Sequence, residues 1–342
     1  MEKLNWGIIG LGSIAQKFAE GFNDTDNAKL LAAASQNPKR LSSFEEKFKL
    51  DKKYLFNNYD KLINCKDVDI VYIALPNAYH YDWTIKSIEN NKNVLVEKPA
   101  TINFKEAKNI ENLLLSKDIF FGEAFMYRYH PQISLLLNII KNDEIGNPLS
   151  MHSYFGTNIL TKKKLFFFNK KKKIDKKNRL FNKYLGGGCI LDLGCYPSSL
   201  SILISSLINT SNKKNYKLTN VHKEVGETLV DIHSYAELIF EKNFVSKIGA
   251  SFKENLGMES RIIGEKGSII LNNTWLGSQN LVKIKDNMKH VLDVNSEKNI
   301  YSYQIQNISK NILNGINKPI YPGMTIQETL FNMRIMEDWL NV

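Results

Sequence analysis

The first third of the chain alternates short apolar runs with amphipathic stretches, and this alternation restricts the possible folds more than any other feature. The apolar runs predict buried strands, and the amphipathic stretches between them, such as residues 39–48 and 83–89, predict helices. Strands separated by helices form a parallel, doubly wound α/β sheet with right-handed connections. The predicted strands are residues 6–9, 29–34, 70–75, 93–96 and 119–121.

The pattern changes after residues 146–148. The later strands alternate apolar and polar positions, which is typical of a mostly antiparallel sheet with one covered face. We expect these strands at residues 149–154, 231–240, 245–251 and 261–271, and two closing helices at residues 303–313 and 325–340. A chain of 342 residues suits two domains. We therefore predict an α/β dinucleotide-binding domain over residues 1–123 and an α+β domain over residues 124–342.

The composition is that of a globular protein, with 43% hydrophobic and 24% charged residues. No basic region precedes a long apolar stretch at the N-terminus, and Asp192 interrupts one of the most apolar regions. We expect a cytoplasmic protein without a membrane partner. Cys65, Cys189 and Cys195 form no Cys-x-x-Cys pair, and no paired His spacing accompanies them. We therefore expect neither a disulfide scaffold nor a metal site.

The net charge of +11 is concentrated in one segment. Residues 161–179 contain ten basic residues against Asp175 alone, so the rest of the chain is close to neutral and no nucleic-acid partner is expected. Aromatic residues 166–168 lie among these lysines, and such a segment can contact RNA or an acidic surface. The favoured interpretation is a solvated insertion loop, because the whole chain is rich in Lys and Asn.

A glycine motif, Gly10-x-Gly12-x-x-Ala15, follows the first predicted strand and begins a helix. In this context the first glycine makes the tight turn, the second admits a dinucleotide pyrophosphate, and Ala15 allows close helix packing. The helix N-terminus, including the amides of Ser13 and Ile14, supplies N–H groups for the phosphates. The motif predicts a nicotinamide dinucleotide site.

The end of the second predicted strand indicates which dinucleotide is bound. A site for NAD usually carries an acid there to bind the ribose diol, and this chain instead has Ser35 and Gln36. Lys39 and Arg40 follow, and a basic side chain suits a 2′-phosphate. This pattern favours NADP over NAD, although the two basic residues also fit a solvated helix start.

Glu97-Lys98-Pro99 ends another predicted strand, at the sheet edge where doubly wound folds bind ligands. A cis bond before Pro99 would turn the chain sharply and direct Lys98 into the cleft. Burial and a positively charged nicotinamide both disfavour the Lys98 ammonium, which suits a proton relay. The alternative is an ordinary surface Lys-Pro pair.

The segment from Gly186 to Tyr196 carries a carboxylate and a phenol four residues apart, at Asp192 and Tyr196. In a helix this spacing places both on one face, where they can handle protons. The preceding glycines allow close approach of a ligand or a strand. The alternative is a buried Asp and Tyr with a structural role only.

Together these motifs make the chain resemble the glucose-fructose oxidoreductase and inositol dehydrogenase family, Gfo/Idh/MocA, over essentially its full length. The matching segments are residues 6–15, 74–77 with His80, 97–99, 123–131, 186–196 and 321–325.

The resemblance implies a Rossmann domain followed by an open-faced sheet domain that binds substrate and pairs copies into a homodimer or homotetramer. It places Lys98 on the family's catalytic lysine and Asp192 on its helix aspartate. Tyr196 replaces a common histidine, as in the branch with dimeric dihydrodiol dehydrogenases, where the tyrosine is taken to transfer the proton. The resemblance further implies cofactor contacts from Leu75, Asn77, His80, Glu97, Lys98 and Arg128.

One departure concerns the cofactor, because relatives that use NADP often have Arg where this chain has Gln36. The expected function is NAD(P)-dependent interconversion of an alcohol and a carbonyl on a sugar or related polyol. One alternative substrate is a trans-dihydrodiol. A non-catalytic regulator that senses a dinucleotide or sugar is the alternative from another class, and the intact set of Lys98, Asp192 and Tyr196 favours an enzyme.

Overall fold

A computed structural model describes residues 2–164, 168–208 and 215–342, with side chains left undescribed at residues 162–171. Two compact units are present, one made of residues 1–130 with 297–330 and the other of residues 131–296 with 331–342. Residues 297–330 thus pack with the N-terminal unit, whereas the division expected from the sequence placed them in the second domain. The domain boundary after residue 123 stays a prediction.

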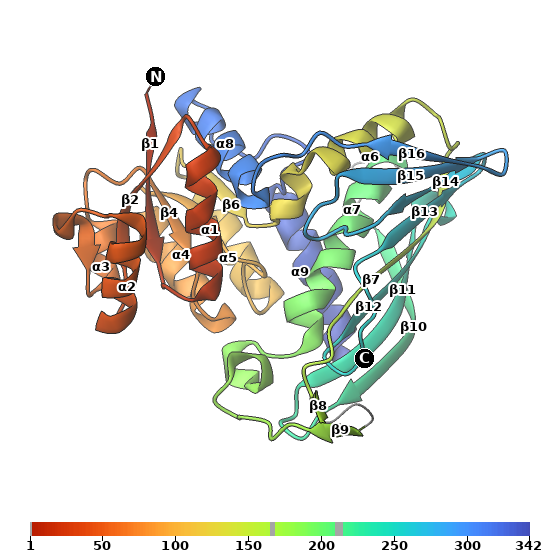
Figure 1. The fold of residues 1–342 in the computed structure, drawn as a ribbon, viewed down its shortest axis with the longest axis horizontal. Coiled ribbons are helices and arrows are strands. Elements are labelled where there is room, and N and C mark those ends of the chain that lie inside the picture. The colour runs from red at the N-terminus through yellow and green to blue at the C-terminus, as the bar shows by residue number, and fades with distance from the viewer. Residues whose placement is uncertain (1, 165–167, 209–214) are drawn as a thin grey trace. The chain divides into compact units, whose positions relative to one another are not determined.

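The first unit contains a six-stranded parallel sheet in the order β3-β2-β1-β4-β5-β6 (Figure 1). This confirms the doubly wound sheet predicted from the alternating pattern. Its strands are β1 Leu4–Ile9, β2 Ala28–Ala34, β3 Leu55–Phe56, β4 Ile70–Ile73, β5 Asn93–Val96 and β6 Phe121–Glu123. Its helices are α1 Ser13–Glu20, α2 Pro38–Phe48, α3 Tyr59–Ile63, α4 His80–Glu89, α5 Phe104–Leu114 and α8 Ile300–Leu313.

Alternating strand residues build a separate core on each face of this sheet. Ile9, Val71 and Val94 pack on the face covered by α3, α4 and α5, where Ile63, Ile88 and Ile110 meet them. Trp6 and Tyr72 point to the other face, where the ring of Phe18 from α1 stacks on Tyr72 with centroids 3.7 Å apart. Both faces are therefore buried, as a parallel sheet requires.

Helix α8 joins the first unit although it lies almost 300 residues from β1. The indole Nε1 of Trp6 donates to the Ser309 hydroxyl at 2.9 Å, and Ser302 Oγ donates to the Gly21 carbonyl at 2.8 Å. Both contacts are buried. They explain why a C-terminal helix belongs to the N-terminal sheet.

The second unit contains an eight-stranded sheet in the order β10-β11-β12-β7-β13-β14-β15-β16. Neighbouring strands are antiparallel except for the parallel β12–β7 pair. The prediction of a mostly antiparallel sheet is confirmed. Its strands are β7 Pro148–Gly156, β10 Tyr216–Val225, β11 Asp231–Phe240, β12 Val245–Ser251, β13 Ser260–Gly264, β14 Gly267–Leu271, β15 Asn280–Lys285 and β16 Met288–Asp293.

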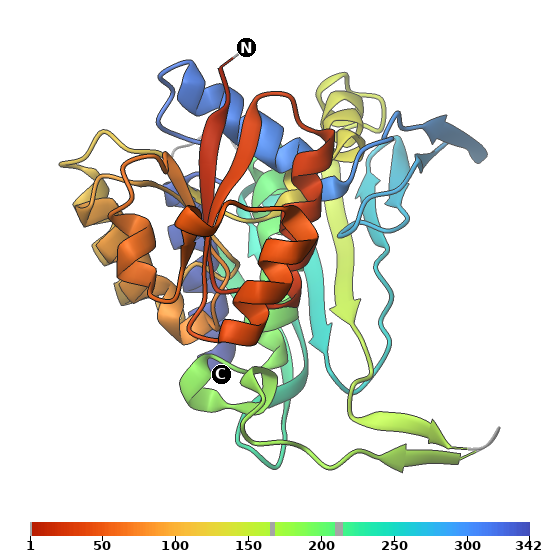
Figure 2. The same cartoon turned by 60° about the vertical axis from the view of Figure 1, so that its left-hand side comes forward.

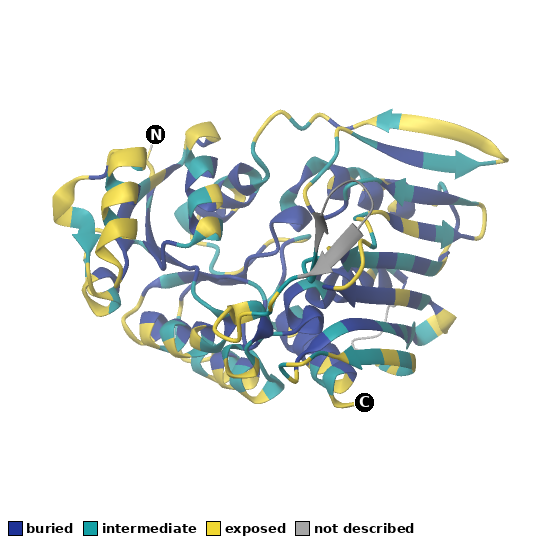
Figure 3. Ribbon diagram, turned by 60° about the horizontal axis from the view of Figure 1, so that its bottom comes forward, coloured by how far each residue is buried: buried dark blue, intermediate teal, exposed yellow. Residues whose placement is uncertain are grey.

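The helices of the second unit are α6 Pro131–Lys141, a π-helical turn at Ile190–Gly194, α7 Cys195–Ile208 and most of α9 Ile326–Asn341. In the described part of the chain, the helical stretch Lys183–Ile208 is long and apolar enough to cross a membrane, with a mean hydropathy of 1.3. However, 89% of its apolar window is buried, and nearly all residues of α7 belong to the buried class that Figure 3 colours dark blue. This is also the burial of a helix in a protein core.

One expected strand is wrong in detail, and the Lys-rich segment contains strands that the sequence did not indicate. The strand expected over residues 261–271 is a hairpin, because the chain turns at Glu265 and Lys266 between β13 and β14. The Lys-rich loop instead contains a two-stranded antiparallel sheet of β8 Thr161–Lys164 and β9 Phe168–Lys171, drawn in Figure 2. Phe166 and Phe167, which suggested RNA contact, lie outside the described residues.

Candidate active site

The two glycines before α1 differ in what surrounds them. Gly10 has a φ of +86°, and a Cβ there would lie 2.6 Å from the Ala74 carbonyl oxygen, so the turn itself requires glycine. Gly12 has an ordinary φ of −80° and precedes α1 without a side-chain cap. A Cβ on Gly12 would meet nothing within 4 Å. The space over the first amides of α1 fits a pyrophosphate, which needs N–H donors and close backbone approach.

The end of β2 forms a polar corner beside α2. Ser35 is buried, and its hydroxyl accepts from the Asn37 amide at 3.1 Å. The Asn37 side chain in turn caps α2 by accepting from the amides of Lys39 and Arg40. Burial raises the pKa of Tyr59, while a hydrogen bond with the Gln36 backbone and the nearby Arg40 guanidinium oppose that shift. The sequence motifs had not indicated Tyr59.

His80 is fully buried between two backbone carbonyls. Its Nδ1 lies 2.7 Å from the Pro99 oxygen and its Nε2 lies 2.8 Å from the Leu75 oxygen. A neutral imidazole donates from one nitrogen only, so both contacts are hydrogen bonds at once only in the doubly protonated ring. His80 therefore connects the loop after β4, which contains Asn77, with the turn after Lys98.

Glu97 and Lys98 stand at the carboxyl end of β5, followed by a cis peptide bond before Pro99 as the sequence suggested. Glu97 is buried, and its carboxylate accepts from the Tyr72 hydroxyl and from the Lys98 amide. Lys98 itself is half-buried. The carboxylate thus holds the backbone from which the Lys98 side chain extends.

Glu123, at the end of β6, fixes the other side of this turn. Its carboxylate accepts from the Ala100 amide at 3.0 Å and from the Thr329 hydroxyl at 2.8 Å. Burial raises the pKa of Glu123 to about 7, although these two hydrogen bonds oppose the shift. Glu123 therefore links the turn after Lys98 to the C-terminal segment.

Arg128, predicted to contact the cofactor, is fully buried and binds the C-terminal motif. Its Nη1 donates to Glu328 Oε1 at 2.9 Å and to the Pro322 carbonyl at 3.3 Å. Burial alone would lower the pKa of Arg128, but the charge of Glu328 more than offsets this and raises it. The structure thus joins the two sequence motifs at residues 123–131 and 321–325. A cofactor contact from Arg128 stays a prediction.

In the second unit, Asp192 and Tyr196 lie at the junction of the π-helical turn and α7. The stretch is helical as expected, but Asp192 lies in an i→i+5 turn rather than an α-helical one, a feature often found at functional sites. Both side chains are buried. The Tyr196 ring packs at 5.3 Å from Phe155 and 5.4 Å from Trp275, measured between ring centroids.

Arg179 is a candidate site residue that sequence reasoning missed, because it was counted with the Lys-rich segment. Its Nη1 lies 3.0 Å from Asp192 Oδ1, and 46% of its side chain is exposed. The glycines before the turn serve packing, since a Cβ on Gly188 would lie 2.2 Å from Asp231 Oδ1. Asp231 Oδ2 also accepts from the Ile190 amide at 2.6 Å, which anchors the start of the π-helical turn.

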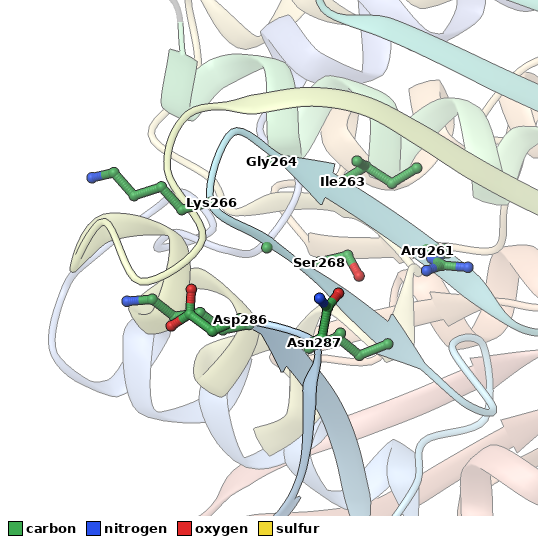
Figure 4. Close-up of a pocket in the computed structure, with 10 residues that line it drawn as sticks. Arg261, Ile263, Gly264, Lys266, Ser268, Asp286 and Asn287 are labelled. Carbon is green, nitrogen blue, oxygen red and sulfur yellow. The ribbon is translucent and has the colours of Figure 1, made fainter.

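The predicted residues therefore fall into two groups. The first unit collects the predicted cofactor residues around the carboxyl ends of β1, β2, β4, β5 and β6, together with Lys98. The second unit holds Asp192 and Tyr196 beside Arg179. A separate pocket in the second unit, between β13, β14 and the β15–β16 hairpin, contains none of them (Figure 4).

The two glycines give a matched pair of variants. We expect Gly12→Val to fold like the parent and to bind dinucleotide about 5–150-fold more weakly, because the new side chain costs about 1–3 kcal/mol where the pyrophosphate approaches. Gly10→Ala should instead lower the free energy of unfolding by about 1–3 kcal/mol, because it places a Cβ at positive φ against Ala74. Calorimetric titration and thermal unfolding of both variants distinguish the two effects. Unchanged dinucleotide affinity in Gly12→Val would contradict the assignment.

Arg179 offers a test of the second group. If its guanidinium orients the Asp192 carboxylate, Arg179→Ala should lower kcat about fivefold. A half-exposed ion pair contributes about 1 kcal/mol, and a loss of that size in transition-state stabilisation slows a reaction about fivefold. Arg179→Lys should recover part of that loss, and the melting temperature should hardly change. Lys177→Ala, an exposed neighbour, is the control. A kcat equal to that of the parent in Arg179→Ala would remove Arg179 from the site.

Comparisons with known proteins agree with this arrangement. Residues 4–124 match the family described as the oxidoreductase family with an NAD-binding Rossmann fold, and residues 134–270 match the GFO/IDH/MocA C-terminal domain. Glucose-6-phosphate 3-dehydrogenase of Bacillus subtilis is 30% identical over 76% of this chain and 72% of its own length. Trans-1,2-dihydrobenzene-1,2-diol dehydrogenase of Xenopus tropicalis is 22% identical over 98% of this chain and 96% of its own.

D-xylose 1-dehydrogenase (NADP(+)) of Hypocrea jecorina is 30% identical over 57% of this chain and 51% of its own length. Among solved structures, aldose-aldose oxidoreductase from Caulobacter crescentus has a TM-score of 0.84 and 19% identity, covering 99% of this chain and 97% of its own. KijD10, a 3-ketoreductase from Actinomadura kijaniata in complex with NADP and TDP-benzene, has a TM-score of 0.83 and 18% identity, covering 98% and 96%. The chain belongs to the Gfo/Idh/MocA family of oxidoreductases with an NAD(P)-binding Rossmann domain.

Proposed function

We propose that this oxidoreductase interconverts an alcohol and a carbonyl on a sugar or related polyol, with Tyr196 and Lys98 handling the proton. The single observation that carries the proposal is the open space at Gly12, directly before the first amides of α1, in the same unit in which Lys98 follows the end of β5. Relatives named as dehydrogenases of glucose 6-phosphate and D-xylose support a sugar substrate. The dehydrogenase names of these relatives favour an enzyme over a non-catalytic regulator.

The dinucleotide, when bound, supplies the nicotinamide that accepts or donates the hydride. In the oxidation direction, the Tyr196 phenolate takes the proton of the substrate hydroxyl while the C–H bond breaks and the carbonyl forms. Lys98 is the second residue assigned to the proton transfer, and its backbone is fixed by Glu97. Asp192, held by Arg179, orients the substrate. In the reverse direction Tyr196 returns the proton to the carbonyl oxygen.

The second candidate substrate is a trans-dihydrodiol. The Xenopus relative with that activity in its name spans almost the whole chain, and the vicinal hydroxyls of a dihydrodiol resemble those of a polyol. Tyr196 also matches the branch that contains such enzymes. A substrate panel therefore has to include both classes.

NADP is the proposed cofactor, rather than NAD. Ser35, Gln36 and Arg40 offer polar and cationic groups beside β2, and the chain has no acid there to repel a 2′-phosphate. The name of the D-xylose dehydrogenase relative supports this choice.

A homodimer or homotetramer through the eight-stranded sheet stays a proposal. Half-buried apolar residues, among them Ile263 on β13, Ile270 on β14 and Ile284 on β15, share one face of that sheet by strand register. Sedimentation of the purified chain would test it. Cytoplasmic location also stays a prediction.

The catalytic assignment is tested by turnover across a panel of aldoses, cyclitols, sugar phosphates, nucleotide-linked sugars and vicinal dihydrodiols, with NADP and with NAD. Lys98→Met and Tyr196→Phe should each lower kcat about 10²–10⁴-fold, the usual worth of acid–base assistance, while dinucleotide binding persists. Lys61→Met and Tyr54→Phe, on α3 and before β3, are the matched controls. Full activity in Lys98→Met would refute the mechanism.

The cofactor assignment has its own test. Arg40→Ala should raise the KM for NADP about 10–150-fold, since a hydrogen bond to a charged phosphate contributes about 1.5–3 kcal/mol, and should leave the KM for NAD unchanged. Lys47→Ala, at the other end of α2, serves as the control. Equal effects of Arg40→Ala on both dinucleotides would argue against a 2′-phosphate contact.

A further inference from the structure

Two histidines and a glutamate cluster on neighbouring strands at one edge of the eight-stranded sheet, and none of them is among the residues assigned above. His222 and Glu224 belong to β10, and His233 belongs to the neighbouring β11. One possible ligand atom from each of the three lies within 4.8 Å of the others. We propose that this cluster binds a divalent transition ion of the Zn²⁺ type.

Strand register places the three side chains on one face. Glu224 pairs directly with His233, and His222 pairs with Tyr235, so alternate residues of both strands point the same way. The register shift between Thr219 and His222 is a bulge that turns His222 onto this face. The side chains of the residues between them point to the opposite face of the sheet, where Lys223 Nζ donates to the Leu340 carbonyl at 2.7 Å.

Neighbouring residues already orient His233, the most buried of the three proposed ligands. His233 is buried, and its Nδ1 lies 2.9 Å from the Ser251 hydroxyl on β12. Its ring also packs edge-on against Tyr235, with centroids 4.8 Å apart. An imidazole whose one nitrogen is engaged presents the other, here Nε2, to a metal. His233 is therefore oriented before any ion binds.

The two outer ligands are exposed and adjustable. His222 Nε2 lies 3.8 Å from Glu224 Oε1, and their side chains are 62% and 36% exposed. Metal–ligand bonds of about 2.0–2.1 Å in a tetrahedron separate neighbouring ligand atoms by roughly 3.4 Å. Small rotations of the exposed side chains are enough to bring the ligand atoms of His222 and Glu224 to this separation. Two imidazoles and one carboxylate are donors that Zn²⁺ accepts with a water as fourth ligand, and they suit Mg²⁺ and Ca²⁺ poorly.

A lysine side chain occupies part of the proposed site. Lys253 Nζ lies 2.8 Å from Glu224 Oε2 and 2.9 Å from Oε1. The lysine side chain is 45% exposed, and exposed ion pairs contribute little to stability. An ion must displace this ammonium, so Lys253 tunes the affinity of the site.

Calorimetric titration of untagged, chelator-treated protein with Zn²⁺ tests the proposal, with Mg²⁺ as the comparison ion. We expect one Zn²⁺ per chain, and a loss of at least about tenfold in affinity in His222→Ala and Glu224→Gln, since even an outer partner of a ligand is worth about 10–100-fold. Lys253→Met should bind more tightly. His290→Ala, an exposed histidine on β16, is the matched control.

The test uses variants of the two exposed ligands, His222 and Glu224, because substitution of the buried His233 can disturb folding. A second readout is the melting temperature, which excess Zn²⁺ should raise in the parent and His290→Ala but not in His222→Ala. No saturable Zn²⁺ binding by the parent would overturn the proposal. Parent-like affinity in both His222→Ala and Glu224→Gln would overturn it as well.

Discussion

Two buried carboxylates at the ends of β5 and β6 determine how the dinucleotide-binding unit is assembled. A carboxylate cannot be buried at acceptable cost without hydrogen-bond partners, and those of Glu97 and Glu123 come from distant parts of the chain. Glu97 binds Tyr72 from β4, and Glu123 binds Thr329 from the C-terminal segment. The same segment supplies Glu328, which neutralises the buried Arg128. These contacts give Lys98 a fixed backbone and require residues 297–330 to complete the unit.

Much of the first unit could be predicted from the sequence, because its signals are local. An apolar run such as residues 93–96 is typical of a strand in a sheet whose two faces are both covered by helices. Gly10 and Gly12, two residues apart, mark the turn into α1. The residues around Lys98 were harder to predict. No sequence pattern indicated that Arg128 binds Glu328 or that His80 lies between two backbone carbonyls. Such partners lie far apart in sequence, so no spacing rule reveals them.

The second unit was harder to predict for the same physical reason. Strands β10, β15 and β16 lie beyond the expected set. Strands β13 and β14 were taken as one strand, because a short turn interrupts a run of similar hydrophobicity. The sequence prediction of no metal ligands considered spacing along the chain alone. The pairing of β10 with β11, and the bulge before His222, bring together residues with no motif in common. The contact between Arg179 and Asp192 likewise follows from the fold and from no sequence motif.

A crystal structure of the chain with NADP bound would test the central assignment most directly. We expect the pyrophosphate to accept hydrogen bonds from the first amides of α1 over Gly12, the 2′-phosphate to lie beside Ser35 and Arg40, and the nicotinamide to lie at the end of β5 by Lys98. A dinucleotide bound away from the carboxyl ends of β1, β2 and β5 would contradict this assignment and the catalytic role of Lys98 that depends on it.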